Sequence, residues 1–317
     1  MQNRAFFNSG LLPLIAAIAL KEFQKFPAET FSPISPIYYE RCIDSAIAVF
    51  FCGYLLSVFF RGFRNFWCAK AQLWAAAVLL VIVWDYLTSK TARLPMPYFP
   101  GPERVINVFI EDTDTLFTSV FSSVKLIVLG FLFGSVGGVV CGSLLGWSKR
   151  AAYWLSPVVR ILGPVPATAW IPLCMLIFPT AFTASVFLVS LAVWFPVTLM
   201  TASAIYNVPK AFYEAASILG ADRRRQFFCV AVPHALPTIF VGQFMGVGAS
   251  FLVLITAEMV GASSGLGWYI VWAIGWAAYA KVYATLIVSA VIFSGFIKLL
   301  FLFRDRLLGW QPSFVKW

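Results

Sequence analysis

The sequence predicts an all-α polytopic membrane protein. Hydrophobic residues make up 61% of the chain and charged residues 11%, whereas charged residues are about a quarter of a soluble domain. The mean hydropathy is +0.86, and apolar runs close to the ~20 residues of a spanning helix recur along the chain. The net charge of +10 does not indicate nucleic-acid binding, because the cations lie in short segments between apolar runs.

Eight apolar segments are predicted as spans. They cover residues 5–20, 43–60, 71–88, 115–147, 158–178, 181–206, 235–257 and 281–303. The first is short and could instead be an interfacial helix or a signal segment. It is followed by "KEFQKF" and not by a small-residue cleavage site, so we keep it as a weak span.

The distribution of Lys and Arg predicts that both ends of the chain are cytoplasmic. With the N-terminus inside, the inner segments hold fourteen cations and the outer segments 21–41 and 89–114 hold six. This bias follows the positive-inside rule. The three consecutive arginines 223–225 are then on the cytoplasmic side.

Cysteine and histidine residues indicate no metal site and no catalytic group. The six cysteines form no CxxC pair and show no metal-ligand spacing with the only histidine, His234. We therefore expect no metal, no disulfide framework and no resident cofactor.

Two spans contain small residues at every fourth position. In the fourth span these are Gly130, Gly134, Gly138, Gly142 and Gly146, and in the seventh Gly242, Gly246 and Ser250. Such a face lets another backbone approach closely. The spacing fits helix packing within one chain, and it fits equally the seam of a dimer that opens and closes.

Prolines predict that the fifth span is not a straight helix. The segment "SPVVRILGPVPATAWIP" holds Pro157, Pro164, Pro166 and Pro172, and each removes a backbone donor. Broken backbone at membrane depth is tolerated where it is buried in protein or lines a watery cavity. The pattern therefore favours a transport path over a lipid-facing anchor.

The segment 207–234 between the sixth and seventh spans predicts a helix–glycine–helix elbow. "KAFYEAASIL" favours a helix, and Gly220 offers a C-terminal stop. "ADRRRQFFCVAV" can then form a second short helix, capped by Ala221–Asp222 and ending at Pro233. An exposed elbow with a small apolar surface and a basic flank suits a groove in a partner protein.

This segment resembles the membrane subunits of binding-protein-dependent ATP-binding-cassette (ABC) importers, which carry the pattern E-A-A-x3-G-x9-I-x-L-P. The chain has Glu214, Ala215, Ala216 and Gly220 at this spacing, and it ends in "VAVP", residues 230–233, with Val in place of Ile and Leu. "TAEMVGASSGLGWYI", "PMPYFPGPERVINVF" and "PVVRILGPVPATAWIPL" are similar to the nitrate, sulfonate, taurine and bicarbonate branch. The likeness covers roughly residues 71–305.

The resemblance implies a domain organisation. Residues 71–305 would form the six-helix core of a type I ABC importer permease, with the elbow at 207–234. Residues 1–70 would add an N-terminal transmembrane hairpin whose role stays open, and residues 306–317 a cytoplasmic tail.

The resemblance also implies partners. The permease would work as two copies, expected to be a homodimer, with two ABC ATPase subunits and a periplasmic or lipid-anchored binding protein, in the bacterial cytoplasmic (inner) membrane. Glu214, Ala215, Ala216 and Gly220 would contact the ATPase. The remaining elbow residues flank this contact and are Ala221, Asp222, Arg223, Arg224, Arg225 and Pro233. Plain positive-inside anchoring explains the arginines as well as an ion pair with the ATPase would. The chain lacks a G-x-x-x-x-G-K-[ST] loop, so ATP and Mg²⁺ are expected on the partner.

Three residues are candidates for the translocation path. Lys125 lies inside the fourth span and could snorkel, pair with a carboxylate or provide a cationic field for an anion. Glu258 could pair with a cation or orient the outer loop. Trp194 is explained more readily by packing or by a position in the interface belt than by ligand contact. By resemblance the solute is an anion such as taurine, another sulfonate, nitrate or bicarbonate.

Two rival functions remain open from the sequence. An ATP-independent secondary transporter or channel would leave the elbow pattern unexplained. An integral-membrane enzyme would need convergent catalytic groups, and His234 has no such partner in the sequence.

Overall fold

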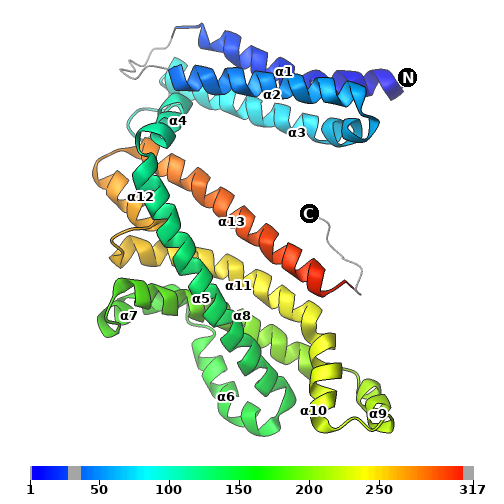
Figure 1. Cartoon of the computed structure of the whole chain (residues 1–317). Coiled ribbons are helices and arrows are strands. Elements are labelled where there is room, and N and C mark those ends of the chain that lie inside the picture. Colours follow the sequence, from blue (N-terminus) through cyan, green and yellow to red (C-terminus); the bar gives the residue numbers. More distant parts are fainter. Residues whose placement is uncertain (1, 28–36, 310–317) are drawn as a thin grey trace. The chain divides into compact units, whose positions relative to one another are not determined.

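The computed structural model describes residues 2–27 and 37–309, and in this part of the chain all regular structure is helical. The chain divides into two compact units, which we describe separately. The first comprises residues 1–113 and 273–284, and the second residues 114–272 and 285–317. Figure 1 shows the helices in chain order.

Among the described residues, six helical stretches are long and apolar enough to cross a membrane. They are α2 (Ile37–Phe59), α3 (Arg61–Asp85) with the π-helical turn η1 (Tyr86–Lys90), α5 (Thr113–Trp147), α8 (Ala181–Tyr206), the stretch that ends in α11 (Val232–Gly261), and α13 (Tyr279–Leu307). A broken pair of helices gives a seventh candidate. The weak first span corresponds to α1 (Gln2–Gln24), which is not among these candidates.

The fifth predicted span is broken, as its prolines indicated. It consists of α6 (Lys149–Leu162), the short 3-10 helix η2 (Ala167–Trp170) and α7 (Ile171–Ile177), with a bend of 85° between the two halves. Pro164 and Pro166 lie in the break, and neither has a backbone N–H with which to continue an α-helix.

In the first unit, α1, α2 and α3 pack side by side (Figure 1). Trp67 on α3 is at the centre: its ring lies 4.7 Å from that of Trp74 and 6.4 Å from that of Phe50 on α2, centroid to centroid. Its indole N–H donates to the carbonyl of Gly10 on α1 at 3.1 Å. One buried aromatic side chain therefore connects all three helices.

The third span begins earlier than the sequence predicted. The basic segment 61–70 was expected to be an inner loop, but α3 starts at Arg61 and runs through it. Lys and Arg are good helix formers, so a basic segment does not by itself end a helix. The proposed domain boundary at residue 70 consequently falls inside α3.

The rest of the first unit lies around α4 (Pro102–Glu111). Val105 and Val108 of α4 are buried together with Ala284 at the start of α13. Nearby, the Lys281 ammonium donates to the Asp112 carboxylate at 2.6 Å.

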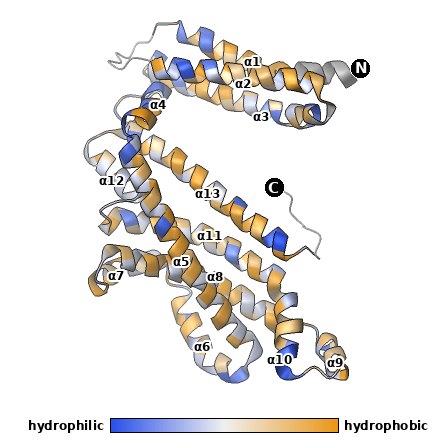
Figure 2. Cartoon of the chain, viewed as in Figure 1, coloured by the Kyte–Doolittle hydropathy of each residue, from blue (hydrophilic) through white to orange (hydrophobic). Residues whose placement is uncertain are grey.

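The second unit is built around α8, which packs against both α5 and α11. Every glycine of the α5 stripe faces α8: a Cβ built on Gly134 would lie 2.5 Å from the Ser190 carbonyl oxygen, and one on Gly138 would lie 2.7 Å from Val197 Cβ. Gly242 and Gly246 of α11 likewise face α8, at Met200 and Val193. Contacts within one chain thus account for both glycine faces. Figure 2 shows these helices as predominantly hydrophobic.

Candidate functional site

The elbow between α8 and α11 has the predicted helix–glycine–helix form. Its first helix is α9 (Lys210–Ile218), and Gly220 follows with φ +77°, a conformation that favours glycine. The Asp222 carboxylate then accepts from the backbone N–H of Arg225 at 3.0 Å and so caps the next helix.

The prediction that the second elbow helix ends at Pro233 is wrong. α10 (Arg223–Arg225) continues through the π-helical turn η3 (Gln226–Ala231) directly into α11, and Arg223–Gly261 is one helical stretch of 39 residues. In the wider turn the N–H of Val232 bonds to the carbonyl of Phe227, five residues back. A π-turn of this kind accommodates Pro233, which has no N–H to donate.

The outer surface of the elbow is apolar and exposed. Ile218 and Leu219, next to Gly220, are each 87% exposed. Glu214 and Ala215 are exposed as well, and Ala216 is half-buried. These residues lie together at one end of the second unit, around α9 and α10 (Figure 1). A soluble surface rarely leaves such side chains uncovered without a partner.

The inner surface of the elbow rests on Trp147, the last residue of α5. Its ring centroid lies 5.8 Å from that of Tyr213 on α9 and 5.2 Å from that of Phe227 in η3. Burial there raises the pKa of the Tyr213 hydroxyl. Trp147 was missed in the sequence, where it is only one of twelve tryptophans, at the end of a span.

The three arginines of α10 have different surroundings. The Arg223 guanidinium lies 6.0 Å from the centroid of the Trp147 ring. Arg224 and Arg225 are exposed, and the described residues provide no ion pair for any of the three. Figure 2 shows α10 as a hydrophilic segment beside apolar helices. The basic flank is therefore available to a partner.

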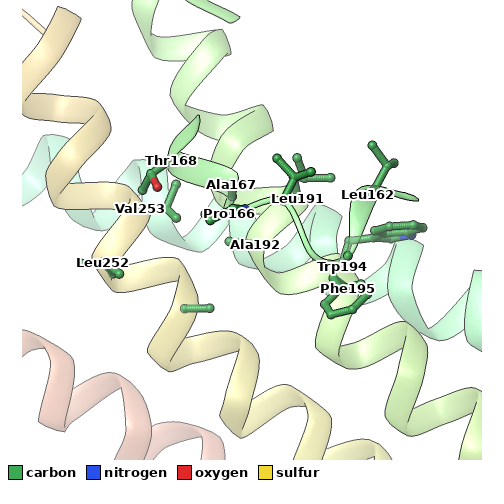
Figure 3. Close-up of a pocket in the computed structure, with 13 residues that line it drawn as sticks. Leu162, Pro166, Ala167, Thr168, Leu191, Ala192, Trp194, Phe195, Leu252 and Val253 are labelled. Carbon is green, nitrogen blue, oxygen red and sulfur yellow. The ribbon is translucent and has the colours of Figure 1, made fainter. Parts of the chain in front are cut away.

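A pocket of about 220 Å³ lies at the break in the fifth span (Figure 3). The pocket is lined from the break by Val165, Pro166, Ala167 and Thr168, from α8 by Leu191, Ala192, Trp194 and Phe195, and from α11 by Ala249, Leu252 and Val253. Apart from Thr168, the side chains are apolar. The pocket has room for several water molecules or one small solute, which fits the expectation that a broken span lines a cavity.

Of the three candidates for the translocation path, the structure brings only Trp194 to this pocket. Lys125 is exposed on α5, with its ammonium 5.3 Å from the centroid of the Phe182 ring. None of the described residues that line the pocket is Lys, Arg or His.

Glu258 is buried near the end of α11, at 1% exposure. One carboxylate oxygen accepts from the Ser123 hydroxyl at 2.6 Å, and the other accepts from the backbone N–H of Gly267 at 2.9 Å. The same Ser123 oxygen accepts from the N–H of Leu266 at 2.8 Å. Of the two roles considered, these contacts correspond to orienting the loop. Sequence spacing gave no signal for Ser123, which is 135 residues away.

In the part of the chain that the structure describes, six long apolar stretches, a broken span beside a pocket and an exposed elbow define a multi-pass membrane protein of the transporter class. Residues 134–308, more than half of the chain, match the family described as "Binding-protein-dependent transport system inner membrane component". The chain belongs to this family of ABC importer permeases, in the nitrate, sulfonate, taurine and bicarbonate branch, which confirms the resemblance seen in the sequence.

The similarity to known permeases extends over most of the chain. It is 28% identical over 247 residues to the nitrate import permease protein of Synechocystis, covering 76% of this chain and 87% of that one. It is 33% identical over 220 residues to a putative aliphatic sulfonates transport permease of Bacillus subtilis, covering 68% and 79%. The taurine transport system permease of Escherichia coli is 30% identical over 224 residues, covering 68% and 80%.

Solved structures support the fold. A crystal structure of an amino acid ABC transporter matches with a TM-score of 0.52 and 19% identity, covering 63% of this chain and 97% of that one. At this identity the match shows the fold alone. It agrees with the predicted all-α fold with an importer-permease core.

Proposed function

We propose that the chain is the membrane-spanning subunit of an ATP-driven importer that moves a small anion inward by alternating access. Two copies would form the path, two separate ABC ATPase subunits would bind the elbows, and a periplasmic or lipid-anchored binding protein would deliver the solute. The complex would lie in the bacterial inner membrane. ATP and Mg²⁺ would be bound by the ATPase, so this chain would move the solute without catalysing a reaction.

The main observation behind this proposal is the exposed elbow between α8 and α11. It presents Ile218 and Leu219 uncovered at its tip, beside a left-handed glycine. Apolar side chains at the tip of a small helical knob suit an apolar groove, and exposed Arg224 and Arg225 suit an acidic rim. Because α10 continues into α11, displacement of the knob would be passed to a membrane helix.

The solute class rests on the relatives, whose names specify nitrate, aliphatic sulfonates and taurine. The apolar pocket beside Thr168 offers no charge that would select one anion over another. We infer that the pocket passes the solute and that the binding protein selects it. The arrangement is consistent with an anion because a passage without acidic side chains does not repel one.

Gly220→Arg tests the coupling. The backbone at φ +77° disfavours a side chain, and the arginine would project into open space at the tip of the elbow. Transport by the reconstituted complex should fall about tenfold or more, as expected for the loss of one contact worth about 1.4 kcal/mol. Insertion of the chain into the membrane should not change.

Gly62→Arg is the matched control, because Gly62 also has open space around it and lies in an ordinary helix. It should transport normally. If Gly220→Arg transports as well as Gly62→Arg, the elbow is not the coupling element.

A pull-down in mild detergent distinguishes the importer from an ATP-independent transporter or channel. Wild-type chain should recover an ABC ATPase, and Gly220→Arg should recover less of it. Wild-type chain that transports its solute in vesicles without an ATPase or ATP would contradict the proposal.

A further inference from the structure

The elbow and the buried carboxylate of Glu258 are at opposite ends of one helical stretch. Arg223–Gly261 comprises 39 residues, which corresponds to roughly 58 Å of helix at 1.5 Å per residue. Arg223 lies in the elbow, and Glu258 lies three residues before the other end. Movement of this stretch as one body would therefore act at both places.

Close packing against α8 makes independent movement of the two ends costly. Gly246 of α11 allows Val193 of α8 to approach so closely that an added Cβ would lie 3.1 Å from the valine side chain. A second contact joins α11 to α5, where the Ser135 hydroxyl donates to the Gln243 side-chain oxygen at 2.6 Å. Packed elements of this kind move as bodies and deform little.

At the far end, Glu258 binds the start of α12 (Leu266–Gly275). A carboxylate at the N-terminus of a helix accepts from free backbone N–H groups and is stabilised by the positive end of the helix dipole. Here it accepts from Gly267 directly and reaches Leu266 through Ser123. The described residues provide no Lys, Arg or His ion pair for it. The Glu258 carboxylate is thus hydrogen-bonded to the backbone at the start of α12, directly at Gly267 and through Ser123 at Leu266.

The loop before α12 is folded around this carboxylate. Gly265 has φ +128°, and a Cβ built on it would lie 2.5 Å from Glu258 Cδ. A Cβ on Gly267 would lie 2.3 Å from the carbonyl oxygen of Ile255. Both positions therefore require glycine so that the loop backbone can close on the end of α11.

We propose that Glu258 is a positioning residue for transport, which ties the loop 262–265 and the start of α12 to α11, so that this loop moves with the helix that ends in the elbow. The proposal rests on the proposed function. Movement imposed on the elbow would then reach the loop at the other end of the stretch, and loss of the carboxylate would let the loop move independently.

Amide hydrogen exchange of the isolated full-length chain tests the tie without any ATPase. In Glu258→Ala, the amide of Gly267 loses its acceptor, and the Ser123 hydroxyl that accepts from the amide of Leu266 loses the carboxylate that holds it. Exchange should be about tenfold faster or more at Gly267, and also faster at Leu266. Glu258→Gln keeps one acceptor oxygen and should give a smaller increase. Ser123→Ala removes the acceptor of Leu266 and one donor to Glu258 but leaves the contact between Gly267 and Glu258, and it replaces Glu258→Ala as the test if that variant does not fold.

Ser135→Ala is the matched control, because it removes the other buried contact between α5 and α11 and leaves α12 untouched. Its exchange at residues 266 and 267 should equal that of the wild type. Unchanged exchange in Glu258→Ala and Ser123→Ala would overturn the tie. The same would follow if Ser135→Ala accelerated these amides equally.

Transport by the complete complex tests the consequence. Glu258→Ala should lose transport about tenfold while ATP hydrolysis by the complex in the absence of solute stays within about twofold of the wild type. Normal transport with fast exchange at α12 would show that the loop is tied but that the tie is not needed. If the wild-type complex itself shows no ATP-dependent transport, the proposed function fails, and the exchange data still decide whether Glu258 holds the loop.

Discussion

The three helices α1–α3 and the three helices α5, α8 and α11 solve the same packing problem in different ways. In the first group, aromatic side chains fill the space between helices, as the ring of Trp67 does between α3 and α2. In the second group, glycine brings one backbone against another, as Gly134 does at the Ser190 carbonyl. The first contact is between a side chain and its surroundings, and the second is between two main chains.

This difference has a mechanical consequence. A side chain can change its rotamer when a neighbour grows, at a cost of about 1 kcal/mol, whereas a helix backbone can respond only by moving as a whole. The glycine-packed group also includes the helix that carries the elbow. Close backbone packing therefore coincides with the part of the molecule that must transmit movement in the proposed function.

The largest effect is expected for Gly134→Ala. The new Cβ would lie 2.5 Å from a backbone oxygen of α8, so α5 and α8 would have to separate. We expect a loss of about 3 kcal/mol in the free energy of unfolding, at the upper end of overpacking costs. Unfolding of the purified chain in mixed micelles at increasing dodecyl sulfate measures it.

Gly137→Ala is the control on the same helix. Its Cβ would meet only the Trp194 ring, at 3.4 Å. The variant should unfold like the wild type. A loss as large as that of Gly134→Ala would mean that glycine is needed for some property of α5 other than its contact with α8.

Sequence reasoning found the glycine face but not its partner. The four-residue spacing from Gly130 to Gly146 shows that a helix approaches, and the same spacing would serve a second copy of the chain. The partner is decided by residues far away in sequence, such as Val193 and Val197 on α8, which have no distinguishing pattern of their own. The spacing of residues along one helix shows that a partner approaches, but it does not show which distant segment that partner is.

Gly53→Ala in α2 should have a smaller effect, although its predicted overlap is closer. The new Cβ would lie 2.1 Å from the far end of the Trp67 ring, and a side chain can shift within its packing where a helix backbone cannot yield locally. We expect a loss of about 1 kcal/mol, the cost of a displaced rotamer with some lost packing. The same unfolding assay measures it.

The double variant Gly53→Ala with Trp67→Phe sharpens the comparison. A smaller ring makes room for the methyl group, so the combined loss should be less than the sum of the two single losses. Additive losses would show that the ring does not absorb the change, and that the first group of helices is as rigid as the second.

Breaks and turns in the chain were predicted to different degrees. Pro164 and Pro166 predicted the broken span, and Gly220 with Asp222 predicted the elbow. Each of these residue types has a backbone preference or a capping side chain that acts within a few residues of its own position. The continuous passage through Pro233 was not predicted. It depends on the π-turn at residues 226–231, which only the surrounding structure reveals.

The smallest effect is expected from pH, at the polar end of the first unit. Burial raises the pKa of Glu103 at the start of α4, where its carboxylate accepts from the Ser89 hydroxyl at 3.1 Å. The carboxyl group of Glu103 therefore binds its proton more tightly in the folded chain than in the unfolded chain, and its contribution to the free energy of unfolding is greatest at low pH. This contribution falls as the pH rises from the ordinary pKa of 4.5 to the raised pKa of the folded chain, and it is constant at higher pH.

Glu103→Gln should remove this part of the pH dependence and leave the variant more stable than the wild type at neutral pH, by less than the effect of Gly53→Ala. Unfolding measured between about pH 4 and 8, a range chosen to include the carboxyl titration, gives the difference between variant and wild type. Glu111→Gln, on the exposed side of the same helix, should follow the wild-type curve. A Glu103→Gln curve parallel to the wild type would mean that the carboxylate is as well solvated in the folded chain as in the unfolded one. In that case water would reach Glu103 at the start of α4 in the folded chain.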